Sequence, residues 1–389
     1  MMRRRYFACR FALIGACALW LAGAAPPTPQ SMRGRAQKSD VESLFPVRGV
    51  TIGPIENALH PERGYGSEPF GRAVDEAAHW GATWVALTPF GRVHDLRSQG
   101  VDPTFEAPPE ENRRAFAKAV RQAHQRGLRV LLVPHLWVES GEWRALIDPG
   151  TDAGWAQWAQ SYGRFALGWA EVAEASGVDM MAAGVELRSW VTTARAPSFA
   201  RLVAQLREVY TGPLTYSGNW DDVEHTVIYG DLDAIGINAF YPLGYKDGAT
   251  PRELWEGGER VRVRVHALAQ AWGKPVYFSE MGYTTRSNPA IKPWEWPDGM
   301  KNVRVDQDAQ AQAYRALLGP LLSEPLFQGF FVWRTYADPD DASQEAEWGF
   351  SPRGKQAERV LRDVYRADWA RDAVTLPGLA PQAPSPGHW

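Results

Sequence analysis

Short apolar runs alternate with longer amphipathic segments along most of the 389-residue chain. The runs are rich in β-branched, aromatic and small residues, a composition that favours buried strands. We predict eight strands, at 45–53, 83–90, 129–137, 180–187, 213–220, 232–241, 275–283 and 327–336. Helices are predicted at 71–81, 110–127, 156–177, 198–210, 252–273, 306–323 and 355–369, with only a short helical piece after the fifth strand.

This alternation predicts an α/β fold, because a helix between two strands returns the chain so that both run in parallel. Eight such units in one catalytic domain, placed at residues 44–370, predict a (β/α)₈ TIM barrel. An open doubly wound sheet is the alternative, and it typically carries a glycine-rich phosphate loop after its first strand. The stretch VTIGPIENALH at that position contains no such loop.

The two ends of the chain differ in composition from the repeating part. Arginines at 3–5, an apolar stretch and a small-residue cleavage pattern predict a signal peptide at 1–24, and hence an exported protein. Both cysteines, Cys9 and Cys17, lie in this segment, so no disulfide is expected after cleavage. A lipid anchor at Cys17 is the weaker alternative. We expect a polar linker at 25–43 and a proline-rich disordered tail at 371–389.

Composition narrows the partners that this chain could bind. A net charge of −3 gives no reason to expect nucleic acid or an anionic membrane, and no apolar stretch is long enough to span one. The chain has 18 tryptophans, and flat aromatic faces pack against the apolar faces of sugar rings. The eight histidines form no pair at metal-ligand spacing, so we expect no metal, no cofactor and no metal-dependent deacetylase. We expect a monomer.

Chemistry-bearing residues gather at the predicted strand ends, where TIM barrels hold their active sites. The residues at these ends are His135, Trp137, Glu186, Asn219, Trp220, Asn238, Tyr241, Glu280, Tyr283, Trp333 and Arg334. Singly, most of them could be structural. Glu280, however, ends a strand that is otherwise buried, where a carboxylate needs partners. Strands four and seven face each other across a barrel, so Glu186 and Glu280 predict the two carboxyl groups of a retaining glycosidase.

The chain resembles glycoside hydrolase family 113 over residues 45–365. The resemblance is carried by LVPHLWVESGEWR, GVELRSW, DAIGINAFYPL, PVYFSEMGYTT, IKPWEWPD, QAQAYRALL and WGFSPRGKQAERVL. Known members are chiefly β-mannanases of the large retaining clan, with catalytic glutamates on strands four and seven. Two positions depart from the patterns: Val185 replaces the clan's asparagine before the acid/base, and Val133 replaces a lysine.

The resemblance implies a role for each matching residue. Glu186 would be the acid/base and Glu280 the nucleophile, which Tyr241 would orient. His135, Trp137, Trp143, Asn238 and Trp333 would line the subsite beside the cleaved bond. We expect Tyr241 or an arginine to keep Glu280 ionised, and burial beside that charge to raise the pKa of Glu186.

The substrate and the loop residues leave alternatives open. The predicted activity is cleavage of β-1,4-mannan or mannooligosaccharides; glucan, xylan or a galactoside is the alternative, and so is a catalytically inactive carbohydrate-binding barrel. Asn219 is a further candidate for sugar contact. Trp294 and Trp296, in the long loop after strand seven, could form a stacking platform or could pack the loop onto the barrel.

Overall fold

The described part of the chain carries the repeating strands and helices. The computed structural model describes residues 41–53, 62–105, 107–296, 299–341, 343 and 345–369. The predicted signal peptide, most of the predicted linker and the predicted tail lie outside these residues. No helix in the described ranges is long and apolar enough to cross a membrane.

Eight parallel strands close into a barrel, as the alternation predicts, with the first strand beside the last. The order around the barrel is β1 (Val47–Gly53), β10 (Phe327–Tyr336), β9 (Val276–Met281), β8 (Ile235–Asn238), β7 (Leu214–Asn219), β6 (Met180–Val185), β4 (Arg129–Leu132) and β2 (Trp84–Leu87). Because all strands run the same way, their carboxyl ends meet at one end of the barrel.

The second and third predicted strands each divide into two. β2 is followed by β3 (Phe90–Val93), and β4 by β5 (His135–Val138); β3 and β5 pair with each other in a separate two-stranded sheet. The breaks fall at Pro89 and Pro134, which have no backbone N–H to donate to a neighbouring strand. This small sheet therefore continues beyond the carboxyl ends of β2 and β4.

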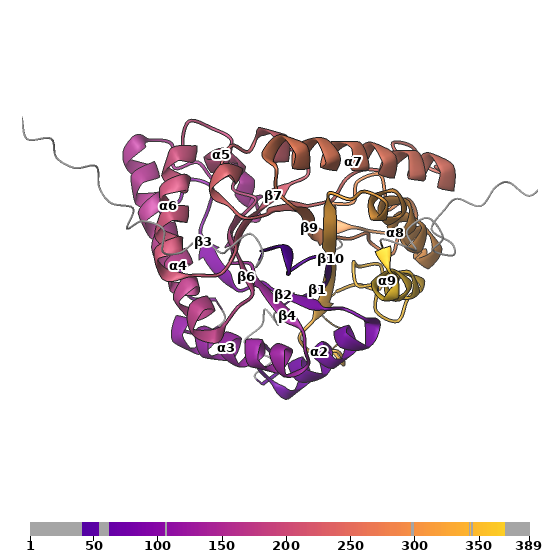
Figure 1. Cartoon of the computed structure of the whole chain (residues 1–389), viewed down its shortest axis with the longest axis horizontal. Helices are drawn as coiled ribbons and strands as arrows, with labels where there is room; N and C mark the ends of the chain where they lie inside the picture. The colour runs from indigo at the N-terminus through magenta and orange to yellow at the C-terminus, as the bar shows by residue number, and fades with distance from the viewer. Residues whose placement is uncertain are drawn as a thin grey trace, which may run out of the picture. The chain divides into compact units, whose positions relative to one another are not determined.

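Helices surround the strands (Figure 1). They are α2 (Glu68–Trp80), α3 (Pro109–Gln125), α4 (Asp152–Ser176), α5 (Arg188–Val191), α6 (Ala196–Val209), α7 (Pro251–Trp272), α8 (Gln307–Leu322) and α9 (Gln356–Arg366). Several begin at side-chain caps that the sequence supplies: Ser67, Thr151 and Thr250 accept hydrogen bonds from the first helical turn. The fifth unit has only the 3₁₀ turns η2 (Val223–His225) and η3 (Tyr229–Asp231), in agreement with the short helical piece predicted there.

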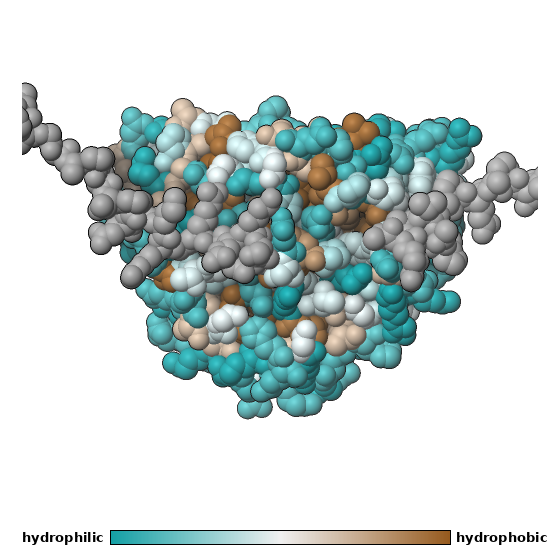
Figure 2. Space-filling model, viewed as in Figure 1, coloured by the Kyte–Doolittle hydropathy of each residue, from teal (hydrophilic) through white to brown (hydrophobic). Residues whose placement is uncertain are grey.

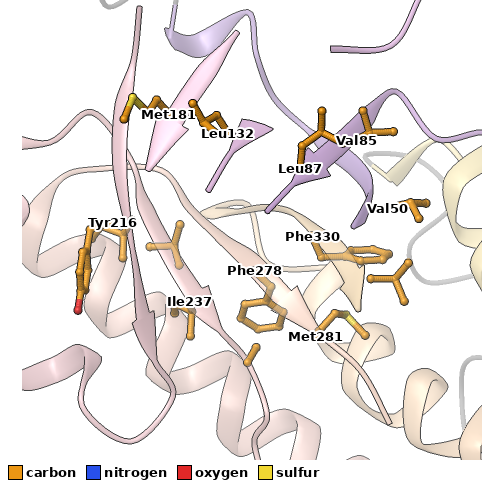
Figure 3. Close-up of a cluster of buried hydrophobic side chains, with 14 of the residues drawn as sticks. Val50, Val85, Leu87, Leu132, Met181, Tyr216, Ile237, Phe278, Met281 and Phe330 are labelled. Atoms are coloured by element: carbon orange, nitrogen blue, oxygen red, sulfur yellow. The ribbon is translucent and has the colours of Figure 1, made fainter. Parts of the chain in front are cut away.

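The strands separate two apolar cores because successive side chains point to opposite faces. In β2, Val85 and Leu87 join the layer between strands and helices, whereas Trp84 and Ala86 join the barrel interior. All eight barrel strands contribute to the outer layer, part of which is drawn in Figure 3. Hydrophilic residues cover most of the helical rim in the view of Figure 2.

The helices α7 and α8 approach each other closely at Gly258. A Cβ atom built on Gly258 would lie 1.9 Å from the backbone oxygen of Ala316. Backbone cannot move aside as a flexible side chain can, so the spacing of the two helices requires glycine at this position.

We expect Gly258→Ala to destabilise the protein by about 1–3 kcal/mol, the usual result of overpacking. Gly163 in α4 is the matched control, because its Cβ would meet Leu202 at an ordinary 3.7 Å. Gly163→Ala should stabilise the helix by up to about 1 kcal/mol. Urea unfolding of both variants measures the two effects, and equal stabilities would contradict this explanation.

Candidate active site

Glu186 follows β6 directly and has an unusual backbone conformation. Its φ is 51°, in the left-handed region that residues other than glycine seldom adopt. The backbone is held there by its neighbours: the Glu186 N–H donates to the Ser217 carbonyl at 2.9 Å, and the Leu187 N–H donates to the Tyr216 hydroxyl at 2.6 Å. Strained backbone of this kind is common at functional sites.

Three N–H donors converge on the Glu186 carboxylate, which is buried. The indole Nε1 of Trp143 donates to Oε2 at 2.8 Å, and the Asn238 amide donates to Oε1 at 3.0 Å. The guanidinium Nη2 of Arg144 lies 3.3 Å from Oε2. These contacts fix the orientation of the carboxylate, and they come from the turn after β5 and from the end of β8.

Glu280 lies near the end of β9, beside its register partner Asn238 on the neighbouring strand β8. It is also buried, and its Oε1 lies 3.2 Å from Nε2 of His135. Within the described residues, neither of these two atoms, nor Nδ1 of His135, has a hydrogen-bond partner in good geometry. Buried polar atoms are nearly always paired in proteins, so these three are candidates for contact with a ligand.

Electrostatics distinguish the two carboxyl groups. Burial, followed by the neighbouring charge of Glu186, raises the pKa of Glu280 to about 8, although Arg144 and Arg334 act in the opposite direction. This differs from the expectation of an ionised Glu280. The physical reason is that Trp143, Asn238 and Arg144 contact Glu186 instead, and desolvation favours the neutral form of the less well-paired acid.

His135 forms the aromatic wall beside Glu280. Its ring lies between Phe90, at 5.2 Å, and Trp333, which stacks on it at 6.0 Å. Burial lowers the pKa of His135 well below its usual value, and the charges of Arg144 and Arg334 add to this effect. A neutral imidazole can donate one hydrogen bond and accept another, which suits a ligand hydroxyl.

Three tryptophans that the sequence analysis named as candidates for sugar contact are about half exposed and also pack against neighbouring rings. Trp137 on β5 is 48% exposed, Trp294 is 47% exposed and Trp296 is 43% exposed. Trp294 stacks on Trp220 at 5.4 Å. Trp296 packs against Phe350 at 5.5 Å. Each loop tryptophan therefore packs against a neighbouring ring and also presents exposed aromatic surface, and its use as a stacking platform stays a prediction.

Two predicted site residues, Tyr241 and Asn219, make no hydrogen bond to either carboxyl group among the described residues. Tyr241 packs on Trp220 and Phe278 under the guanidinium of Arg264, and no hydrogen bond among the described residues joins it to Glu280. We expected Tyr241 to orient Glu280. In the structure its ring instead lies in the layer between the strands and α7, away from that role. The Asn219 amide donates to Asp221 at 2.6 Å.

Two arginines contribute to the site; the sequence indicated Arg334 as a strand-end residue without giving it a role, and it did not indicate Arg144. Arg144 lies in a turn, which no strand-end rule could identify, although it is part of the stretch LVPHLWVESGEWR. Arg334, 5% exposed, lies at the end of β10 among Trp296, Trp333 and Tyr336. No group of metal-binding side chains suited to hold an ion occurs among the residues that the structure describes.

A closed parallel barrel with a buried, aromatic-lined carboxyl pair at the carboxyl ends of its strands is typical of glycoside hydrolases. The family model of Glycoside Hydrolase Family 113 matches residues 60–355, and the chain belongs to this family. This confirms the resemblance seen in the sequence.

Solved structures share the fold. A family 113 β-mannanase from Alicyclobacillus acidocaldarius, in complex with ManMIm, has a TM-score of 0.70 at 24% identity, covering 82% of this chain and 97% of its own. Another family 113 β-1,4-mannanase has a TM-score of 0.70 at 22% identity, covering 83% and 99%. A β-glucuronidase from Ruminococcus gnavus has a TM-score of 0.57 at 15% identity, covering 82% and 50%. No curated protein matches the chain.

The raised pKa of Glu280 predicts a pH-dependent stability. Because the folded protein keeps this proton up to about pH 8, whereas the unfolded chain releases it near its ordinary pKa, folding weakens as the pH rises between the two values. Glu280→Gln removes this dependence, so its melting temperature should increasingly exceed that of the wild type from about pH 5 to about pH 8. Glu171→Gln, on the exposed side of α4, should melt like the wild type. A difference that is constant with pH would contradict the prediction.

Proposed function

We propose that this glycoside hydrolase cleaves β-1,4-linked mannan or mannooligosaccharides with retention of configuration. The observation that carries the proposal is the facing pair Glu186 and Glu280, on the fourth and seventh barrel strands, close enough for one charge to raise the pKa of the other carboxyl. Retaining enzymes of this kind need one carboxyl as nucleophile and one as acid/base. The family, and the β-mannanases among the similar structures, support mannan as the substrate.

The proposed reaction has two displacements. In the first, a carboxylate oxygen of Glu280 bonds to the anomeric carbon while the bond to the leaving oxygen breaks, and Glu186 gives its proton to that oxygen. In the second, Glu186 removes a proton from water, whose oxygen bonds to the anomeric carbon as the Glu280 ester bond breaks. Asn238 donates to Glu186 through its amide and is the register partner of Glu280 on the neighbouring strand, so it would keep both carboxyl groups in place.

The proton must lie on Glu186 when the sugar is attacked, although Glu280 favours the neutral form without substrate. Sugar hydroxyls that donate to Oε1 of Glu280 would supply the hydrogen bonds that this buried atom lacks. The neutral His135 would accept or donate at the same sugar. Substrate binding would therefore stabilise the ionised Glu280, and the pair's single proton would move to Glu186.

Aromatic side chains would hold the rest of the chain of sugars. Trp333 stacks on His135 and Trp143 donates to Glu186, whereas Trp137, Trp294 and Trp296 each present exposed aromatic surface. Such surfaces stack on the apolar faces of sugar rings. Asn219, which donates to Asp221, remains a candidate for sugar contact.

The first experiment follows the anomer that forms first during hydrolysis of mannohexaose. We expect the β-anomer by proton NMR, before mutarotation, because two displacements restore the original configuration. Parallel assays on mannan, glucomannan, xylan and β-glucan test the substrate. An α-anomer would rule out the mechanism, and turnover of xylan or β-glucan alone would rule out the substrate.

Exchange of each glutamate tests the two roles. Glu280→Ala should abolish turnover of every substrate, because no nucleophile remains. Glu186→Ala should lose about 10²–10⁴ in kcat/KM on mannooligosaccharides, as expected for a lost general acid. It should retain most activity on 2,4-dinitrophenyl β-mannoside, whose leaving group needs no proton. The opposite pattern would show that the two roles are exchanged.

A further inference from the structure

We infer that Arg188 is a positioning residue for the acid/base, acting through Trp143. The inference rests on the proposed role of Glu186. Arg188 belongs to the short helix α5 that follows Glu186, and its guanidinium lies 4.6 Å from the centre of the Trp143 ring. The indole of Trp143 in turn donates to Oε2 of Glu186 at 2.8 Å. The arginine itself has no described contact with either catalytic carboxylate.

Two carboxylates hold the guanidinium of Arg188. Its Nε donates to Oδ2 of Asp222 at 2.9 Å, and its Nη2 donates to Asp221. Asp222 is 3% exposed, so this anchor lies inside the protein. A planar guanidinium that donates from two of its nitrogens is held in one orientation, and it offers its flat face to the indole. The network therefore fixes the plane of Trp143.

A second contact joins the same two segments. The Ser189 hydroxyl, next to Arg188, donates to the Ile147 carbonyl just after the 3₁₀ turn η1 (Arg144–Leu146) that follows Trp143. The segment after β6 and the turn after β5 are thus tied together at two points. The end of β7 supplies the third part through Asp221 and Asp222, so three loops of the barrel meet at Arg188.

This arrangement has a chemical consequence for proton transfer. A general acid must lie within hydrogen-bond reach of the leaving oxygen, and small displacements of the carboxyl group lower its efficiency. Loss of Arg188 would release the Trp143 ring, and the Trp143 N–H would no longer fix Glu186. The nucleophile Glu280 makes none of these contacts. The effect should therefore fall on steps that need a proton and spare those that do not.

The test measures kcat/KM for Arg188→Met on two aryl β-mannosides. With 4-methylphenol as the leaving group, which needs a proton, we expect a loss of about tenfold or more, part of the 10²–10⁴ of general acid catalysis. With 2,4-dinitrophenol, the loss should stay within about threefold. Arg260→Met is the matched control, since Arg260 also lies over an aromatic ring, Tyr245, but on α7; it should match the wild type on both substrates.

A double-mutant cycle tests whether Arg188 acts through Trp143. Trp143→Phe removes the N–H that holds Glu186, and we expect the same dependence on the leaving group. Adding Arg188→Met to Trp143→Phe should then cost little more, because the path is already broken. Additive losses, or equal losses on both substrates, would overturn the inference and leave Arg188 a structural or substrate-binding residue.

Two further variants keep the test decisive. If circular dichroism shows that Arg188→Met does not fold, Asp222→Asn replaces it in the test, because this variant keeps the arginine and weakens the hydrogen bond that holds it. Equal losses of kcat/KM on both aryl mannosides in Asp222→Asn would then overturn the inference. Glu186→Ala is measured alongside. If kcat/KM of Glu186→Ala falls equally on both aryl mannosides, the proposed role of Glu186 fails. If it falls mainly on the substrate whose leaving group needs a proton, but Arg188→Met shows no such difference, only the present inference is overturned.

Discussion

Closure of the barrel between its first and last strands is the constraint on which the site depends. β1 and β10 pair in parallel along most of their length, and at Gly329 the two backbones approach so closely that a Cβ would lie 2.1 Å from the Val47 carbonyl oxygen. This pairing places the fourth and seventh strands across from each other. An open sheet of the same strands would put Glu186 and Glu280 on one surface but not face to face.

Burying two carboxyl groups close together costs free energy, because both lose contact with water and their charges repel each other. The neighbouring side chains decide which of the two keeps the proton. Burial and mutual repulsion favour a proton on one of them. Glu186 has the donors Trp143, Asn238 and Arg144, whereas Glu280 lies beside a neutral histidine. The asymmetry makes Glu280 the group with the raised pKa in the protein without substrate. Stability is given up here for chemistry, as is usual at active sites.

The loops beyond the strands decide what surrounds the pair. The small sheet of β3 and β5 carries His135 past the end of β4 and against Trp333, and the following turn brings Trp143 and Arg144 to Glu186. Proline at two positions ends the barrel strands and so permits this extension. Specificity in barrel enzymes resides in such loops, because the barrel itself is a packed core.

Alternating apolar runs and helical periods determined the barrel, and carboxylates at strand ends indicated Glu186 and Glu280, since these are local patterns that any parallel fold must obey. Local patterns could not predict that the strand after Leu132 breaks and resumes in another sheet, nor that Arg144 comes from a turn to Glu186. They also misplaced Tyr241, whose ring turns towards α7, and did not predict that burial and the charge of Glu186 raise the pKa of Glu280. Sequence position sets where a strand ends, but distances between loops, and the donors that reach each carboxylate, exist only once the barrel has closed.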